Sequence, residues 1–121
     1  MQILLPHTRR HDITFHRKGL IRITARVVHA LKLKPGDSIN IAVSDGEYLL
    51  FAVRHKIGRH EAQCHPTKRG GFNYSANSTR LCQSLFMSLG LEADKVSFMV
   101  GEPTESQSTT YLPIITHMPL C

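Results

Sequence analysis

The chain has 121 residues, of which 41% are apolar, which is enough for one domain with a hydrophobic core and too few for two domains of ordinary size. No apolar run approaches the roughly 18 residues that a membrane span needs, and the short run at residues 3–5 lacks the basic start of a signal peptide. We therefore expect one domain over residues 1–121, soluble and cytoplasmic, with no membrane partner.

Basic residues gather in the first half of the chain. The formal net charge is +6 with histidines neutral. Residues 1–60 carry eleven Lys and Arg against four Asp and Glu, whereas residues 61–121 carry four against five. Such an asymmetry is typical of a surface that binds a polyanion, although solvated surfaces without a nucleic-acid partner have it too.

The cysteines and histidines have no spacing typical of a metal module. Cys64, Cys82 and Cys121 form an odd set, so neither a disulfide framework nor a four-ligand zinc module is indicated. Three histidines and one cysteine lie between residues 54 and 65, but three basic side chains in that stretch would repel a cation. We therefore predict reduced thiols, no metal and no cofactor.

The first predicted elements are two strands and a helix. Residues 12–17 alternate apolar and polar side chains, which indicates a strand, and a Lys-Gly pair supplies the turn after it. Residues 20–23 alternate again. Thr24 can cap a helix over residues 25–31, whose apolar residues have helical spacing.

A hairpin follows this helix. The sequence Lys-Pro-Gly-Asp at residues 34–37 ends the helix, because proline does not continue it and glycine permits a tight turn. Residues 38–43 alternate as a strand, Asp45-Gly46 is a hairpin turn, and residues 48–53 form the return strand.

The second half repeats this order with fewer identities. Residues 31–43 (LKLKPGDSINIAV) align with residues 89–100 (LGLEADKVSFMV) when one turn residue is omitted. The second helix is expected to begin at a cap, Ser75 or Ser78, and to end near Leu89.

The rest of the second copy is less regular. Its first strand has only a weak counterpart around residues 62–65, beside a proline that argues against a long central strand. The tight turn of the first copy is replaced by the polar stretch from Gly101 to Thr109, which we expect to be a mobile loop before the return strand. The two copies are then residues 12–54 and residues 62–116.

The first copy resembles a known family. The strings KGLIRIT (residues 18–24) and LKLKPGD (residues 31–37), followed by an alternating strand, resemble the AbrB-type swapped-hairpin family of SpoVT-AbrB and MazE-like domains. Such families build one barrel from two chains with interleaved hairpins. Two divergent tandem copies in one chain imply a mainly β fold with short helices, a swapped-hairpin (double-psi-like) β-barrel formed as a single-chain pseudo-dimer. One half alone would be too small to bury its apolar faces.

The resemblance also implies a DNA-binding, transcriptional regulator-like protein whose partner is double-stranded DNA. Members commonly contact DNA with basic residues around the strand-to-helix loop. The chain departs from the family pattern at Leu20, where arginine is frequent, and at Thr24, where proline is frequent. The DNA-binding residues that we predict are Arg17, Lys18, Arg22 and Arg26 in the first copy and Lys68, Arg69 and Arg80 in the second. One strong and one weak DNA face are expected.

Other interpretations stay open. The basic residues can instead form a solvated rim that keeps a barrel soluble. A protein-interaction or adaptor barrel would use the Gly101 to Thr109 loop. An antitoxin-like component would need a toxin-wrapping tail, for which residues 116–121 are too few. Further pairing of two chains into a homodimer is also compatible with the pattern.

An enzyme is the interpretation that the residues favour least. The serines, the scattered histidines and the sparse carboxylates form no set of nucleophile, base and orienting group that the spacing supports. We predict no catalytic residue.

Overall fold

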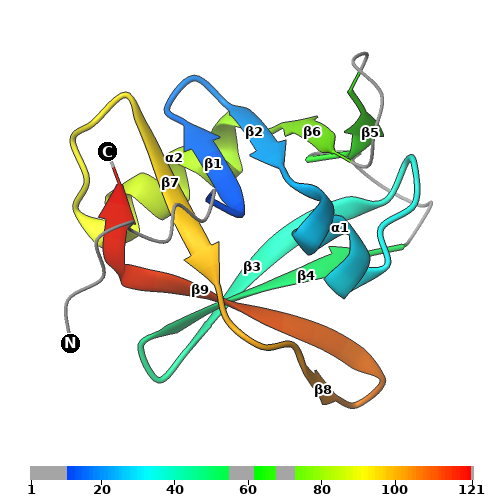
Figure 1. The fold of residues 1–121 in the computed structure, drawn as a ribbon. Coiled ribbons are helices and arrows are strands. Elements are labelled where there is room, and N and C mark those ends of the chain that lie inside the picture. The colour runs from blue at the N-terminus through cyan, green and yellow to red at the C-terminus, as the bar shows by residue number, and fades with distance from the viewer. Residues whose placement is uncertain (1–10, 55–61, 68–72, 121) are drawn as a thin grey trace, which may run out of the picture.

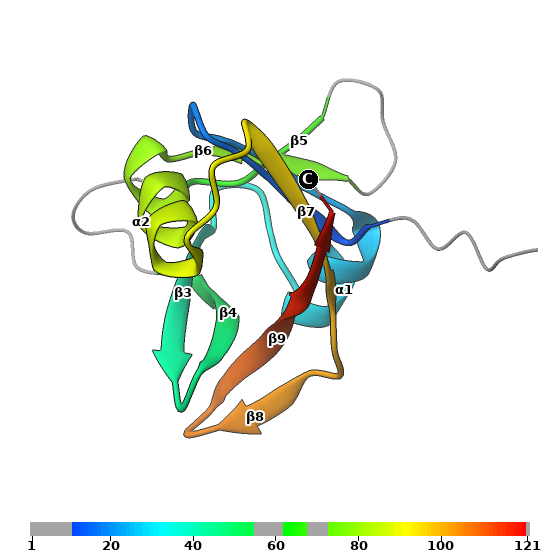
Figure 2. The ribbon, with the colours of Figure 1, turned by 90° about the vertical axis from the view of Figure 1, so that its left-hand side faces the viewer.

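One curled antiparallel sheet, which forms a half-barrel, dominates the protein (Figure 1). The computed structural model describes residues 11–54, 62–67 and 73–120. This part is mainly β and holds two helices, α1 (Ala25–Leu31) and α2 (Thr79–Leu89), which lie on opposite sides of the molecule (Figure 2). The strands are β1 (Ile13–His16), β2 (Leu20–Ile23), β3 (Ser38–Ser44), β4 (Glu47–Val53), β5 (His65–Pro66), β6 (Tyr74–Asn77), β7 (Lys95–Val100), β8 (Thr104–Ser106) and β9 (Thr109–Leu120).

The hairpin of β1 and β2 forms where the alternating pattern predicts it. Its turn requires glycine, because Gly19 has a φ of 118°, and a Cβ there would lie 2.9 Å from the backbone nitrogen of Thr79. The N–H of Gly19 donates to the carbonyl of His16 (2.9 Å). The first turn of α2 therefore packs directly on this hairpin.

The two helices are capped in different ways at their N-termini. Ser78 caps α2 itself, since its hydroxyl accepts from the N–H of Leu81 (3.1 Å). Thr24 occupies the N-cap position of α1 as predicted, but its hydroxyl donates to the carbonyl of Asp12 (2.9 Å). The cap acceptor for α1 comes from a distant residue instead: Asn73 Oδ1 accepts from the N–H of Ala25 (3.0 Å). Ser75, the other cap candidate for α2, lies within β6.

The two helices end alike. The C-cap of α1 is Lys32 and that of α2 is Gly90, both in the left-handed conformation (φ 53° and 66°). The N–H of the next residue, Leu33 or Leu91, reaches back to a carbonyl five residues earlier at 2.9 Å. This is the hydrogen-bond pattern of a Schellman motif.

Two hairpins project from the same end of the molecule (Figures 1 and 2). The first, β3–β4, turns at Asp45 and Gly46, which both have positive φ. The second, β8–β9, corrects the expected loop from Gly101 to Thr109. That stretch contains β8 and a tight turn at Gln107 and Ser108 (φ 51° and 67°), so much of it is regular hairpin.

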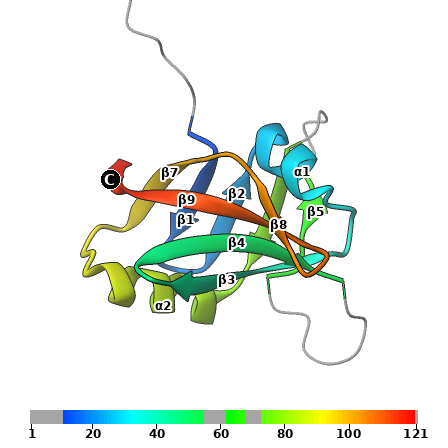
Figure 3. The same cartoon turned by 90° about the horizontal axis from the view of Figure 1, so that it is seen from below.

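The sheet follows the order β3-β4-β9-β7-β1-β2-β6-β5. Strand β9 lies between β4 and β7 (Figure 3) and is longer than the predicted return strand. Strand β1 pairs with β7, and β2 pairs with β6, so the two halves alternate within one sheet. The weak strand expected around residues 62–65 appears as a bridge from Gln63 to Ser38 and as the two-residue β5.

A single hydrophobic cluster draws on both halves of the chain. Phe15 of β1 and Phe98 of β7 pack edge to face at its centre, with ring centroids 6.0 Å apart. The largest fully buried side chains are Phe15, Phe86, Phe98, Ile13, Ile21, Ile23, Leu50, Leu112, Val27, Val96, Cys64 and Cys82. Neither helix in the described part is long and apolar enough to cross a membrane.

Candidate nucleic-acid interface

The hairpin of β1 and β2 divides its side chains between the core and an outer face. Ile13 and Phe15 of β1 and Ile21 and Ile23 of β2 are at most 1% exposed. Side chains alternate across a strand, so the intervening positions face outward. These outer positions are Thr14, His16, Leu20 and Arg22.

Arg22 stands in the middle of a polar row that crosses five strands. Its cross-strand neighbours are Thr14 on β1 and Ser75 on β6. The row continues to Ser97 on β7 and to His65 on β5, and the hydroxyls of Thr14 and Ser97 are hydrogen-bonded at 2.7 Å. Directly opposite residues have Cβ atoms about 4.5–5.5 Å apart. A ligand lying along this set of five side chains, the Arg22 row, would meet all of them.

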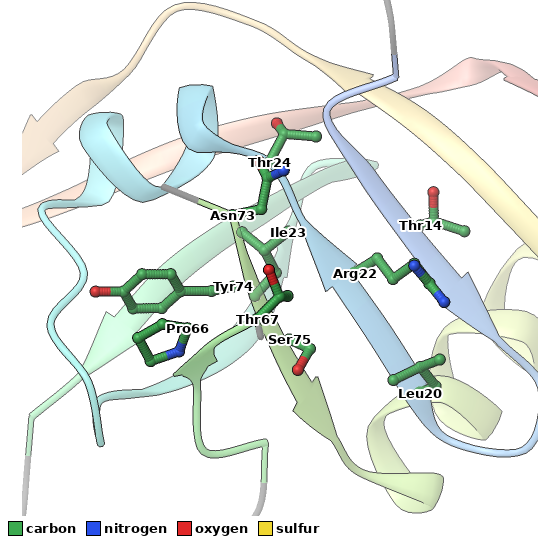
Figure 4. Close-up of a pocket in the computed structure, with 10 residues that line it drawn as sticks. All are labelled: Thr14, Leu20, Arg22, Ile23, Thr24, Pro66, Thr67, Asn73, Tyr74 and Ser75. Atoms are coloured by element: carbon green, nitrogen blue, oxygen red, sulfur yellow. The ribbon is translucent and has the colours of Figure 1, made fainter. Parts of the chain in front are cut away.

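A depression of about 740 Å³ overlaps this row at Thr14, Arg22 and Ser75 (Figure 4). Arg22 lies at one end of it, Tyr74 and Pro66 lie at the other, and Ser75 and Thr67 lie between them. None of the described residues that line it is acidic. The remaining lining residues are Thr14, Leu20, Ile23, Thr24 and Asn73.

The Arg22 side chain is exposed on this face. Within residues 11–54, 62–67 and 73–120, it makes no hydrogen bond and no ion pair. Its guanidinium group therefore keeps its donors for solvent or for a ligand.

His16 lies beside two cations of the outer face. The pKa of His16 is lowered from its ordinary value of 6.5, first because burial disfavours the charged imidazole and then because Arg22 and Lys95 place positive charge near it. Lys95 is the cross-strand partner of His16 on β7. Asp94 and Lys18 line a smaller depression of about 570 Å³ with His16.

Arg17 was predicted to contact DNA, but its guanidinium group points into the molecule. Its Nε and a terminal nitrogen donate to the carbonyls of Ala93 (3.1 Å) and Leu91 (3.0 Å), just after the end of α2. Its Cζ lies 5.1 Å from the centre of the Phe86 ring, a cation–π arrangement. These contacts give Arg17 a structural role at the C-terminus of α2.

Arg26 lies beside a buried carboxylate. Its Nε is 3.9 Å from Asp12 Oδ1, and the side chain of Asp12 is only 4% exposed. The other oxygen of that carboxylate accepts from the N–H of Val100 at 2.9 Å. Part of the positive charge of Arg26 is therefore compensated within the protein.

The structure brings Lys18 and the start of α2 together. The hydroxyl of Thr79 donates to the carbonyl of Lys18 (3.1 Å), and Arg80 follows on the exposed side of the first turn. The remaining two predicted contacts, Lys68 and Arg69, lie outside the described residues.

Sequence reasoning did not single out several residues of this face. Lys95 follows the second helix at the position of Ser38 in the aligned copies, so the alignment could have indicated it. The strand pattern around Ser75 was read as a helix cap. Asn73 carries no local signal, because its bond to the N–H of Ala25 joins residues 48 positions apart.

The thiols and histidines form no reactive group in the described part of the chain. Burial, with a smaller contribution from the Asp37 carboxylate, raises the pKa of Cys64 to about 12, and burial raises that of Cys82 to about 11. Both thiols are therefore protonated at neutral pH. His65 is exposed, and no group of three or more His, Cys, Asp or Glu side chains there could hold a metal ion.

Comparison of this chain with family models, with curated proteins and with solved structures finds no match.

Proposed function

We propose that the protein binds double-stranded DNA with the outer face of β7, β1, β2 and β6, as a transcriptional regulator does. The observation that carries the proposal is Arg22. It is exposed at the centre of a five-strand polar row and has no hydrogen bond or ion pair among the described residues. The lowered pKa of His16 supports it, because Arg22 and Lys95 both contribute positive charge there.

The basic residues would contribute to DNA binding in different ways. Arg22, Lys18 and Lys95 would neutralise phosphates directly, and Arg80 would extend the contact from the first turn of α2. Arg26 would contribute less, because Asp12 already compensates part of its charge. Arg17 would act indirectly, since its hydrogen bonds hold the β1–β2 turn against the end of α2.

We further propose that the half-barrel is a swapped-hairpin, double-psi-like pseudo-dimer related to the AbrB-type family. Each segment before a helix pairs with the hairpin that follows the other helix. The N–H of Arg17 donates to the carbonyl of Asp94, and the N–H of Cys64 donates to the carbonyl of Asp37, both at 2.7 Å. The matching Schellman motifs at the ends of α1 and α2 also support a duplicated unit.

The test is binding of a mixed-sequence duplex as a function of salt. The logarithm of the binding constant should fall with the logarithm of the salt concentration, by about 0.9 per phosphate neutralised. Arg22→Ala should weaken binding and make that slope shallower by about one phosphate. Lys34→Ala is the matched control, because Lys34 is an exposed cation on the turn before β3, outside the Arg22 row. No binding at low salt, or binding insensitive to salt, would contradict the proposal.

A second candidate function is a protein-interaction barrel, which the β8–β9 hairpin favours. All three residues of β8 are exposed, and among the described strands β8 pairs with β9 alone, off the main path of the sheet. An extended segment of a partner could add to such an edge. If deletion of residues 102–108 abolished capture of one specific protein while the full chain failed to bind duplex DNA, this candidate would replace DNA binding.

A further inference from the structure

The depression beside Arg22 has the chemistry of a small binding site as well as that of a flat contact surface. Its volume of about 740 Å³ lies within the range of about 300–1,000 Å³ that is usual for small-molecule sites. The described lining residues include one cation, Arg22, and no carboxylate to oppose it. An anionic group is therefore the ligand feature that the depression complements best.

Several polar groups around the depression are already used within the protein. The hydroxyl of Thr14 bonds to Ser97, and that of Thr24 bonds to the carbonyl of Asp12. The oxygen of the Asn73 amide is held by the N–H of Ala25, which leaves its NH2 group as a donor.

Other groups keep their hydrogen-bonding capacity for a ligand. The hydroxyls of Ser75 and Thr67 lie between the two ends of the depression (Figure 4), and in the described part of the chain neither has a hydrogen-bond partner. Ser75 is directly opposite Arg22, so its hydroxyl and the guanidinium group can meet one ligand group together.

The two ends of the depression differ in character. The Arg22 end is charged, whereas Tyr74 and Pro66 line the other end (Figure 4). The Tyr74 side chain is partly buried against the hydrophobic core, so only part of its ring is open to a ligand. The flat ring of any nucleic-acid base can stack on an aromatic side chain. A ligand that spans the depression would thus carry an anion at one end, hydroxyls in the middle and a flat apolar ring at the other end.

We infer that this depression binds one nucleoside monophosphate unit, with the phosphate at Arg22 and Ser75 and the base at Tyr74 and Pro66. The inference goes beyond the proposed function and shares with it only the exposed cation Arg22. A duplex keeps its bases stacked inside, so the unit would be either a free nucleotide or an unpaired nucleotide of a single strand. Both sources share the same chemistry.

The experiment titrates the full chain with 5′-AMP, adenosine, inorganic phosphate, a short single-stranded oligodeoxyadenylate and a mixed-sequence duplex. We expect 5′-AMP to bind at least about tenfold more tightly than adenosine or phosphate, because only 5′-AMP fills both ends. Binding of the single strand in addition would identify a strand nucleotide as the source. Binding of 5′-AMP without the single strand would identify a free nucleotide. If the single strand binds and 5′-AMP does not, that result would count against the inference.

Variants test the position of the ligand. Ser75→Leu fills the depression without changing the charge and should weaken 5′-AMP binding by about tenfold or more. Thr67→Val keeps the shape, removes one hydroxyl and should have a smaller effect in the same direction, which keeps the test valid if Ser75→Leu unfolds. Asn77→Leu is the matched control, because Asn77 is exposed on the same face of β6 outside the depression, and it should bind 5′-AMP as the unaltered chain does.

The inference and the proposed function fail in different ways. If the duplex binds but 5′-AMP does not bind at millimolar concentration, the nucleotide site is wrong and DNA binding stands. If 5′-AMP binds and the duplex does not, DNA binding is wrong and the nucleotide site stands. Equal binding of 5′-AMP and phosphate, or unchanged binding by Ser75→Leu, would also overturn the inference.

Discussion

The two faces of the β1–β2 hairpin are built from neighbouring residues but do different things. On the inner face every side chain is almost completely buried in a core shared by both halves of the chain. On the outer face the other four strand positions carry Thr14, His16, Leu20 and Arg22, so three of the four side chains are polar or basic. The comparison teaches that one hairpin can anchor the fold and present the candidate site, and that the two roles can be separated by mutation.

The largest effect is expected on the inner face. Phe15→Ala removes a ring that packs against Phe98 with no exposed surface, so it should lower the free energy of unfolding by about 3–5 kcal/mol. Urea unfolding measures this. Lys18→Ala, on the exposed turn of the same hairpin, is the control and should stay within about 0.5 kcal/mol. Similar losses from both variants would mean that the hairpin is not divided in this way.

The turn that joins the two strands should tolerate little change. Gly19→Ala places a Cβ 2.9 Å from the Thr79 backbone nitrogen and strains a residue with φ of 118°. We expect a loss of about 1–3 kcal/mol in the free energy of unfolding, read from the denaturant midpoint. A variant with unchanged stability would show that α2 can move away from the hairpin without cost.

Two arginines on this hairpin form a matched pair. Arg17→Met keeps an aliphatic chain over Phe86 but loses the hydrogen bonds to the carbonyls of Leu91 and Ala93, so the free energy of unfolding should fall by about 1–3 kcal/mol. Arg22→Met makes the same chemical change on the outer face and should alter stability by less than about 0.5 kcal/mol. For duplex binding the order should be reversed, so that Arg22→Met weakens binding more than Arg17→Met does. Equal effects of the two variants on stability would contradict the assigned roles.

The smallest effect concerns pH. The folded protein holds the pKa of His16 below 6.5, so the unfolded chain binds more protons once the pH falls toward and below that value. The contribution of His16 to stability is thus present above pH 6.5 and is lost as the pH falls from there to the folded pKa. His16→Gln should show a weaker fall of the urea midpoint between neutral and mildly acidic pH. A phosphate bound near Arg22 and Lys95 would oppose their charge, so duplex binding should tighten as the pH falls through the same window.

The sequence predicts the local elements of this fold well. The bounds of α1 and the turn at Asp45 and Gly46 follow from apolar spacing and turn residues, which act over a few positions. Strand β8 was missed because its three residues are all polar and exposed, so no alternation of apolar side chains marks it.

The candidate site was only partly predictable for a different reason. Sequence indicates which residues are basic and near the hairpin, but not where a long side chain ends. Arg17 and Arg22 looked equivalent, yet one guanidinium reaches carbonyls 74 and 76 positions away and the other reaches no described partner. The depression beside Arg22 needs β6 next to β2, a pairing that local patterns do not encode.

The position of β9 in the sheet affects how the protein can fold during synthesis. Strand β9 is the last strand of the described order, and it lies between β4 and β7 in the middle of the sheet. A growing chain on the ribosome must therefore carry β4 and β7 with unpaired edges until residues 109–120 have emerged. Such edges can pair with other chains, and long-range pairings form slowly. Folding of this protein should thus be late and cooperative, and the exposed strand edges should make the nascent chain prone to aggregation before β9 has paired.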